Sequence, residues 1–167
     1  MSIALEINDA GLILAADGEI LVRAEQVMMG YWNDADATAA ALVDGWLATG
    51  DIGRIDAQGY LSVVDRSKDI IITGGENVSS REVEDVLIAA TGVDRVAVVG
   101  APDPHWGEMV CAFIVAADVD QFDEGALLGH ARDHLAGFKI PKRVVLIDEL
   151  PVNASGKVLK NELRARL

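Results

Sequence analysis

The stretch that decides the fold runs from Ser79 to Ala90 and reads SSREVEDVLIAA. Ser79 and Glu82 stand three residues apart, which fits a capping box, where each side chain accepts a hydrogen bond from the other residue's backbone N–H. Apolar side chains then recur at i, i+3, i+4 and i+7, at Val83, Val86, Leu87 and Ala90. This spacing places them in one stripe. The stretch therefore predicts an amphipathic helix, capped by Ser79, that packs on a core through one face.

Strands and further helices are predicted after this helix. Residues 93–100 and 109–117 are apolar runs typical of buried strands, and residues 143–147 form a shorter one. Helices are expected over residues 123–135 and 159–167. The order from residue 79 is therefore helix, strand, strand, helix, strand, helix. This order predicts an α+β fold class, with a small mixed sheet covered by helices.

The part of the chain before residue 65 is predicted to consist mainly of β-strands. Residues 3–24 predict short strands around turns at Asn8–Gly11 and Ala16–Gly18. Residues 51–56 and 59–64 predict the two strands of a hairpin. The sequence thus predicts a β-rich front.

Two shorter elements and a boundary complete the expected layout. A short helix is expected from Asp34 to Leu42, with Asn33 as its N-cap. A short buried strand is expected over residues 69–73. The charged run at 65–68 marks the break between the β-rich front, residues 1–64, and the second domain, residues 70–167.

Composition and charge exclude several classes of protein. The 167 residues carry a net charge of −13, which argues against a general nucleic-acid binder because phosphate affinity comes from Lys and Arg. Residues 138–167 nevertheless carry 7 basic and 3 acidic side chains, whereas residues 1–137 carry 7 and 24. This asymmetry indicates either an anion handled by the C-terminal end or a solvated basic surface.

Cellular location is inferred from three absences in the sequence. The longest apolar run, Met109–Ala117, is far shorter than the roughly 20 residues of a membrane helix. Residues 1–10 lack the basic and apolar regions of a signal peptide. Cys111 is the single cysteine, so no internal disulfide can form. A cytoplasmic, reducing setting is expected.

The first chemical candidate is Lys157, which ends the segment Ser155-Gly156-Lys157. A Walker phosphate loop would need Gly at position 151 and Ser or Thr at position 158, but Pro151 and Val158 stand there. A small, flexible loop can still extend the lysine ammonium toward a phosphate or carboxylate. The alternative is a surface turn with a solvated lysine.

Three further segments could contact a nucleotide. Asp51 ends a glycine-containing turn and could accept the hydroxyls of a ribose. Arg66 could hold ribose oxygens or phosphate through its guanidinium fork. Gly74 and Gly75 permit positive φ and a close approach of backbone to a ligand. Ordinary turns and a solvated hinge are the alternatives at all three places.

Metal binding and thiol chemistry are not indicated. His130 and His134 stand four residues apart, but no Glu follows His130 as in a zincin helix and no third ligand is evident. No metal site is therefore expected. Cys111 lies inside an apolar run, so a buried structural thiol is expected.

Taken together and in order, these segments resemble one family, the adenylate-forming acyl-CoA synthetases, whose superfamily includes firefly luciferase and peptide-synthetase adenylation domains. The resemblance runs from about Gly18 to the end, and it is most similar to the fatty-acyl and related branches. The segments that carry it include GEILVR at 18–23, TGD at 49–51, GYLSVVDRSKD at 59–69, ITGGENV at 72–78, GFKIPK at 137–142 and LPVNASGK at 150–157.

The resemblance implies roles for individual residues. Asp51 would bind the ribose hydroxyls of ATP, and Arg66 the ribose and phosphate side. Lys68 would lie at the hinge, residues 65–69, about which a mobile C-terminal domain turns. Lys157 would be the catalytic lysine of adenylation. A last group, formed by consecutive residues, would line the channel for the pantetheine arm of CoA: Gly74, Gly75 and Glu76.

The implied reaction joins a carboxylic acid to CoA through acyl-AMP, with ATP–Mg²⁺ and CoA as substrates and no bound prosthetic group. The family's phosphate loop, its adenine and magnesium segment and its acyl pocket would lie upstream, and none of them occurs in residues 1–167. Residues 1–17 fit the family poorly, which suggests a truncated start. The isolated chain is therefore expected to be inactive.

Two other readings stay open at this stage. The chain could be a non-catalytic, stand-alone fragment that binds CoA, nucleotide or a partner. It could also be the C-terminal part of a peptide-synthetase adenylation domain, although Lys68 at the hinge and the absence of a following carrier domain favour CoA as the acceptor. Unpaired strands in the β-rich front predict a homo-oligomer.

Overall fold

The computed structural model describes residues 5–6 and 11–167 of the chain. The chain divides into two compact units, one reaching to Lys68 and the other running from Asp69 to Leu167. The expected turn at Asn8–Gly11 lies mostly outside the described residues. No helix among the described residues is long and apolar enough to cross a membrane.

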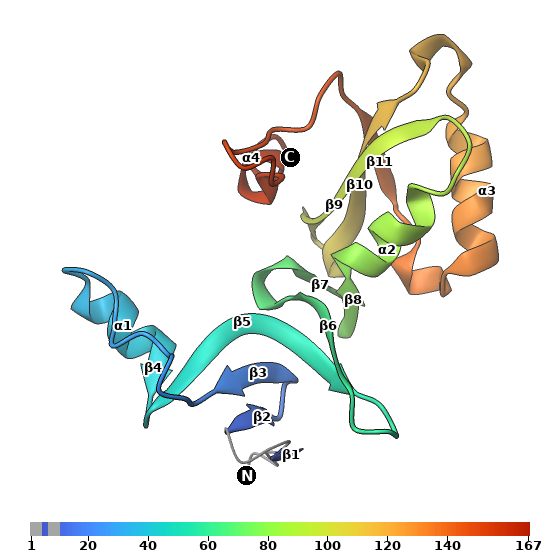
Figure 1. The fold of residues 1–167 in the computed structure, drawn as a ribbon. Coiled ribbons are helices and arrows are strands. Elements are labelled where there is room, and N and C mark those ends of the chain that lie inside the picture. Colours follow the sequence, from blue (N-terminus) through green and yellow to red (C-terminus); the bar gives the residue numbers. More distant parts are fainter. Residues whose placement is uncertain (1–4, 7–10) are drawn as a thin grey trace. The chain divides into compact units, whose positions relative to one another are not determined.

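The first unit is built on one antiparallel sheet. Its strand order is β1-β2-β3-β5-β4, and β6 pairs with β5. The strands are β1 (Leu5–Glu6), β2 (Leu12–Leu14), β3 (Glu19–Val22), β4 (Leu42–Val43), β5 (Trp46–Ile55) and β6 (Leu61–Arg66). The long, curved β5 stands out in Figure 1 as the strand that joins most of this sheet.

The predicted turns of this unit are confirmed where the structure describes them. The turn at residues 16–18 brings the Gly18 N–H to the Ala15 carbonyl at 2.9 Å. The hairpin between β5 and β6 turns at Asp56, whose carboxylate accepts hydrogen bonds from the N–H groups of Gln58 and Tyr60, each at 2.9 Å. An aspartate that bonds its own following backbone is a common way to fix such a turn.

The short helix α1 (Ala35–Ala41) is present, but its cap differs from the prediction. Asp34 is the N-cap, and its Oδ1 accepts a hydrogen bond from the Ala37 N–H at 2.8 Å. Asn33 was expected in that place and instead adopts a φ of 52° in the preceding turn. The prediction of Asn33 was wrong because two adjacent residues can both cap a helix, and the local pattern does not rank them.

The second unit is a five-stranded sheet with helices on both faces. Strand β10 is its centre: it pairs antiparallel with β9 and β7 and parallel with β11, and β8 pairs with β7. The strands are β7 (Ile70–Thr73), β8 (Glu76–Ser79), β9 (Val93–Asp103), β10 (Gly107–Ala116) and β11 (Arg143–Leu146). The predicted α+β class with a mixed sheet is confirmed.

The helices of the second unit follow the predicted order. They are α2 (Ser80–Leu87), α3 (Glu124–His134) and α4 (Lys160–Arg164). Short 3-10 turns lie at η1 (Ser67–Asp69), η2 (Val119–Gln121) and η3 (Gly137–Lys139). Ser79 caps α2 as expected, since its hydroxyl accepts a hydrogen bond from the Glu82 N–H at 3.2 Å.

The core of this unit has two layers, one on each face of the sheet. Helices α2 and α3 cover one face and α4 lies against the other (Figure 1). Side chains of β9 and β10 alternate between the layers, as the period of two in a strand requires. Val98 and Ala112 therefore face α2 and α3, whereas Val99 and Phe113 face the side that holds Leu163 of α4.

Strand β8 was not predicted by the sequence analysis, which considered Gly74 and Gly75 as a place of close backbone approach to a ligand, with an ordinary turn as the alternative. Thr73 and Glu76 are instead opposite each other in a β7–β8 hairpin whose tip is Gly74–Gly75. The charged and amide side chains at Glu76 and Asn77 hid the strand, because they carry no apolar alternation.

Candidate active site

Asp51 and Arg66 lie side by side on the first unit. They are directly opposite in the β5–β6 pair, and the Arg66 Nε lies 2.6 Å from the Asp51 Oδ1. The Arg66 side chain is 46% exposed and that of Asp51 29%. Two candidates that stand 15 positions apart in the sequence thus form one exposed carboxylate–guanidinium pair.

Asp51 lies within strand β5 and does not end a turn as expected, and the residues before it are held by contacts from β3. The Glu19 carboxylate accepts a hydrogen bond from the Gly50 N–H at 2.8 Å. The Thr49 hydroxyl donates to the Ile20 carbonyl at 2.8 Å and accepts from the Asp51 N–H at 3.1 Å. Gly50 itself has a φ of 72°, which favours glycine. The Asp51 carboxylate is therefore fixed before any ligand arrives.

Glu19 was not found as a site residue from the sequence. Its contact with Gly50 spans 31 positions and depends on the pairing of β3 with β5. The only local signal was a glutamate directly after the turn glycine Gly18, which is a common arrangement without functional meaning.

Lys68 is the last residue of the first unit and lies in η1. The next residue, Asp69, begins the second unit and forms an ion pair with Arg164 of α4 at 2.8 Å. The Asp69 side chain is only 13% exposed. The boundary between the two units is thus tied directly to the C-terminal helix.

The glycine pair forms the tip of the β7–β8 hairpin beside Trp106. Gly74 donates its N–H to the Trp106 carbonyl at 2.9 Å, and a Cβ at Gly74 would lie 2.7 Å from the Trp106 ring. Gly75 has open space around it, and Glu76 is exposed. Backbone can therefore approach a ligand closely at Gly75, while Gly74 is needed for the packing of Trp106.

The surroundings of Trp106 add a cation that the sequence analysis did not single out. The Lys142 Nζ lies 4.2 Å from the centre of the Trp106 ring. The Asp103 carboxylate accepts hydrogen bonds from the N–H groups of Trp106 and His105 at 2.8 and 2.9 Å. These two bonds lower the pKa of Asp103 below its ordinary value.

Lys157 lies in a closed turn between β11 and α4. Val152 and Val158 form an isolated bridge, and the Asn153 N–H donates to the Lys157 carbonyl at 2.9 Å. The Leu159 N–H donates to the Pro151 carbonyl at 2.8 Å. Residues 151–159, which include the loop expected to extend Lys157, form a small, internally bonded hairpin that leaves Lys157 exposed.

The side chain of Asn153 lies inside this turn. Its Oδ1 accepts hydrogen bonds from the Lys157 N–H, the Ser155 N–H and the Ser155 hydroxyl. Sequence reasoning missed it as a site residue. The available signal was the Asn-x-Ser-Gly pattern, in which an Asn side chain bonds its following backbone and a glycine supplies positive φ. Gly156 has a φ of 80°.

Helix α4 anchors the far end of the Lys157 turn to the sheet. The Lys160 Nζ lies 2.7 Å from the Glu84 Oε1 and donates to the Ser80 hydroxyl at 2.6 Å. The same Glu84 oxygen accepts the Val98 N–H of β9 at 2.8 Å. With the Arg164–Asp69 pair, this network fixes α4 against α2, β9 and the start of the second unit.

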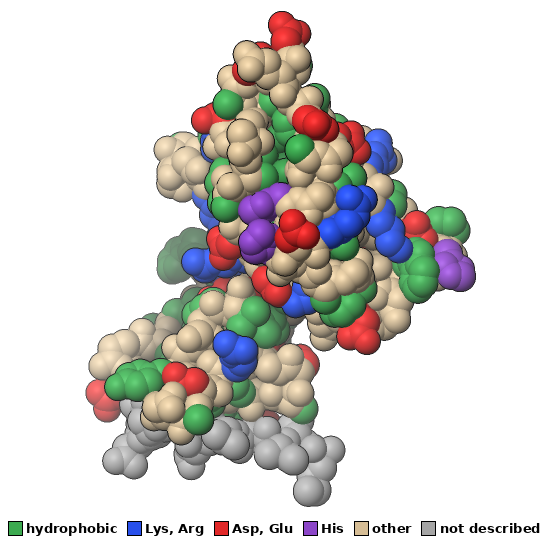
Figure 2. All heavy atoms as spheres, turned by 90° about the vertical axis from the view of Figure 1, so that its right-hand side faces the viewer, with side chains coloured by type: hydrophobic (Ala, Val, Ile, Leu, Met, Phe, Trp, Pro, Cys, Tyr) green, Lys and Arg blue, Asp and Glu red, His purple; other side chains and the backbone are tan. Residues whose placement is uncertain are grey.

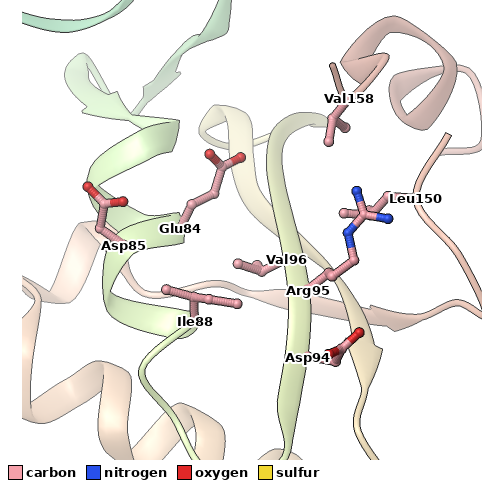
Figure 3. A pocket seen from close by; sticks show the side chains of 8 residues that line it. All are labelled: Glu84, Asp85, Ile88, Asp94, Arg95, Val96, Leu150 and Val158. Atoms are coloured by element: carbon pink, nitrogen blue, oxygen red, sulfur yellow. The ribbon is translucent and has the colours of Figure 1, made fainter. Parts of the chain in front are cut away.

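A cavity of about 290 Å³ lies between α2, β9 and the segment around the Lys157 turn (Figure 3). Its lining mixes apolar and charged side chains from Glu84, Asp85, Ile88, Asp94, Arg95, Val96, Leu150 and Val158. None of the residues predicted to act on nucleotide or CoA lines it.

The remaining candidates behave as structural groups. Cys111 is buried, and burial raises the pKa of its thiol to about 11, so it is the expected inert core thiol. The His130 Nε2 lies 3.1 Å from the Val86 carbonyl, and His134 stacks on His130. Within residues 5–6 and 11–167, no group of three or more His, Cys, Asp or Glu side chains could hold a metal ion.

Charged side chains do not gather by sign on the face that Figure 2 shows. Lys and Arg are interspersed there with Asp and Glu. The basic excess of residues 138–167 is also partly neutralised by ion pairs, such as the one between the Lys139 Nζ and the Glu82 Oε1 at 2.6 Å.

Comparison with known proteins gives a consistent result. The AMP-binding enzyme C-terminal domain family matches residues 82–157. A feruloyl-CoA synthase from an Amycolatopsis species is 50% identical over 149 residues, which are 89% of this chain and 30% of that protein. A long-chain-fatty-acid–CoA ligase from Mycobacterium tuberculosis is 44% identical over 158 residues, 94% of this chain and 31% of that protein.

The structural comparison agrees with the sequence comparison. ATP-bound MatB from Rhodopseudomonas palustris has a TM-score of 0.82 and 41% identity, covering 89% of this chain and 30% of that one. The chain thus spans about 30% of the length of these proteins. The matched part ends at Lys157, the residue that the closed turn exposes.

Proposed function

We propose that this chain supplies Lys157 for acid adenylation and a CoA-binding face for thioester formation. Support comes from residues 82–157, which match the AMP-binding enzyme C-terminal domain family, and from the identity of 50% to a feruloyl-CoA synthase and 44% to a long-chain-fatty-acid–CoA ligase. The observation that carries the proposal is the exposed Lys157, held at the end of a closed turn. The choice of acid substrate is proposed to depend on residues outside this chain, because the matched relatives are named for different acyl groups, feruloyl and long-chain fatty acyl.

Adenylation needs a cation where two anions meet. A carboxylate oxygen attacks the α-phosphorus of ATP, the bond to the leaving pyrophosphate breaks, and the products are acyl-AMP and magnesium pyrophosphate. Two unit charges 4 Å apart repel by about 4 kcal/mol at an effective dielectric constant of about 20. The Lys157 ammonium, placed between the carboxylate and the α-phosphate, offsets this repulsion and stabilises the charge that develops on phosphorus.

Asp51 and Arg66 are proposed to hold the ribose. A carboxylate can accept hydrogen bonds from both ribose hydroxyls at once, as acidic residues do in nucleotide folds. Arg66 orients that carboxylate through the 2.6 Å contact and keeps further N–H donors for ribose or phosphate oxygens. The contacts of Glu19 and Thr49 with the backbone of Gly50 and Asp51 support this role.

Thioester formation is proposed to use the Gly74–Gly75 tip and Glu76. The CoA sulfur attacks the acyl carbon of acyl-AMP, the bond to AMP breaks, and the thiol proton is lost. The open space around Gly75 fits the narrow pantetheine arm. Lys68, the last residue of the first unit, is proposed to lie at a hinge of residues 65–69 that lets a mobile C-terminal domain, residues 70–167, serve both half-reactions in turn.

The setting proposed for this activity is the cytoplasm. Support comes from the lone cysteine, which is buried and free. A reducing compartment keeps such thiols unpaired.

The test is a chimera in which this 167-residue chain replaces the matching part of the Amycolatopsis feruloyl-CoA synthase. The rest of that enzyme supplies the upstream domain. The chimera is expected to exchange pyrophosphate into ATP with ferulate and to form feruloyl-CoA. Lys157→Ala should lower exchange by about 10²- to 10³-fold while thioester formation from supplied feruloyl-AMP survives. Arg166→Ala, which removes an exposed charge from the same tail, is the control.

Two outcomes would refute the proposal. One is a chimera that shows no exchange; the other is equal loss of both half-reactions in Lys157→Ala. The 167-residue chain alone is expected to show no exchange, because the phosphate loop and the adenine segment are absent from its sequence.

A further inference from the structure

We propose that Asn153 is a positioning residue that sets the direction of Lys157 for adenylation. The inference rests on the proposed function of Lys157. It adds a residue whose side chain contacts no substrate and acts only through the backbone of the lysine.

Three donors converge on the Asn153 side-chain oxygen. Lys157 N–H lies 2.9 Å from Oδ1, Ser155 N–H 3.0 Å and the Ser155 hydroxyl 2.8 Å. Two of these donors are backbone N–H groups, which can only donate. The amide oxygen must therefore face into the turn, so the orientation of the amide is determined by its partners.

The contact to Lys157 fixes the base of a long side chain. Lysine carries about 2 kcal/mol of rotamer entropy in its four-carbon stem, so its ammonium is guided only as well as its backbone is held. Without Asn153 Oδ1, the Lys157 N–H would lose its bond, and the turn would rely on backbone bonds alone: Asn153 N–H to the Lys157 carbonyl, Gly156 N–H to the Asn153 carbonyl and Leu159 N–H to the Pro151 carbonyl. A solvated turn of that kind is expected to sample several directions.

The role is separable from folding. Asn153 is exposed, and neither core layer of the second unit includes it. The core residues nearest in sequence, Leu150 and Val158, point to the sheet and would be untouched by a change at position 153. Removal of this side chain should therefore disturb the turn and leave the domain folded.

The first measurement uses the 167-residue chain. In Asn153→Ala, amide hydrogen exchange at Lys157 should become about fivefold faster, the change that corresponds to the loss of one net hydrogen bond of about 1 kcal/mol. Exchange in β10 should not change. Ser155→Ala is the matched control, because it removes the hydroxyl bond to Asn153 and keeps the bond to the Lys157 N–H.

The second measurement uses the feruloyl-ligase chimera. Asn153→Ala should lower kcat for pyrophosphate exchange by about 10- to 100-fold, the cost of a misplaced catalytic group, with KM for ATP nearly unchanged. Thioester formation from supplied feruloyl-AMP should stay within about threefold, because that step does not use Lys157. Asn153→Asp, whose carboxylate accepts the same three bonds, should restore most of the exchange rate.

The outcomes separate this inference from the function on which it rests. If Lys157→Ala lowers exchange and Asn153→Ala does not, the role of Asn153 is wrong and the proposed function stands. Equal loss of both half-reactions in Asn153→Ala, or no recovery in Asn153→Asp, would mean a merely structural residue. If Lys157→Ala itself leaves exchange intact, the proposed function fails.

Discussion

At the residue scale, Arg66 contacts the Asp51 carboxylate at 2.6 Å and is proposed to contact the nucleotide as well. Arg66→Ala in the chimera should raise KM for ATP by about tenfold, because one charge-assisted bond to the carboxylate is lost. Steady-state kinetics at varied ATP measure this. Arg54→Ala removes an exposed arginine from β5, the strand that pairs with the β6 strand of Arg66, and should leave KM unchanged; equal effects of the two variants would point to net charge alone.

Gly74 and Gly75 provide a matched pair of substitutions. Both have positive φ, 60° and 86°, but only Gly74 would press a Cβ against the Trp106 ring. Gly74→Ala should therefore unfold at lower denaturant than Gly75→Ala, by a difference of about 1–3 kcal/mol in the free energy of unfolding. Urea unfolding of both chains checks this, and equal midpoints would contradict the close approach of Trp106.

Cys111 gives a pH dependence with a definite sign. Burial raises its pKa to about 11 in the folded chain, above the ~8.5 of an unfolded cysteine. The folded state then binds more protons between these values, so the contribution of Cys111 to stability is complete below about pH 8.5 and declines as pH rises through about 11. Alkylation at pH 8 should be slow when folded and fast in denaturant; equal rates would show an accessible thiol.

Helix α4 is the element that joins several parts of the second unit. Glu84 bonds both Lys160 and the Val98 N–H, and its side chain is only 21% exposed. Glu84→Ala would leave an ammonium and a backbone N–H without that partner and should lower the free energy of unfolding by about 1–3 kcal/mol. Asp85→Ala, on the exposed neighbour, should change it by less than about 0.5 kcal/mol. Urea unfolding distinguishes them.

Elements were predicted well where the period of apolar residues was unbroken. The strands around Val98 and Phe113 and the helix capped by Ser79 follow from local pattern and cap chemistry. Strand β8 was not predicted, because its polar residues show no strand pattern and its presence depends on pairing with β7. The choice of Asp34 over Asn33 as a cap was likewise beyond local pattern.

The sequence analysis named candidate site residues, but it could not predict the distances and contacts between them. Asp51, Arg66 and Lys157 were named from their resemblance to a family. The 2.6 Å contact between Asp51 and Arg66 depends on strand register, which the sequence does not state. Glu19 was missed for the same reason. Asn153 was missed although its bonds are local, because Asn-x-Ser-Gly turns are common on protein surfaces without chemistry.

At the scale of the whole molecule, the first unit exposes much apolar surface. Met29 and Trp32 are 100% and 92% exposed, and Val63 on β6 is 51% exposed. Among the described residues β6 pairs as a strand with β5, and it lies at an edge of the sheet, where strands can associate. We expect the 167-residue chain to form dimers or larger assemblies through this unit.

Light scattering after size-exclusion chromatography at several concentrations measures this association. Val63→Lys on the edge strand should shift the population toward monomer, since charged side chains at an edge oppose strand pairing. Val119→Lys, at an exposed apolar position of the second unit, is the control. A monomer at all concentrations would refute the prediction.

The turn of residues 151–159 draws its bracing from within, through its own bridge, backbone bonds and the Asn153 side chain. The shape of this segment is therefore held mainly by its own contacts. Under the proposed hinge motion, the turn would keep its shape while Lys157 moves with it. We expect residues 151–159, transplanted into an unrelated hairpin of matching width, to hold the Lys157 ammonium in the same direction.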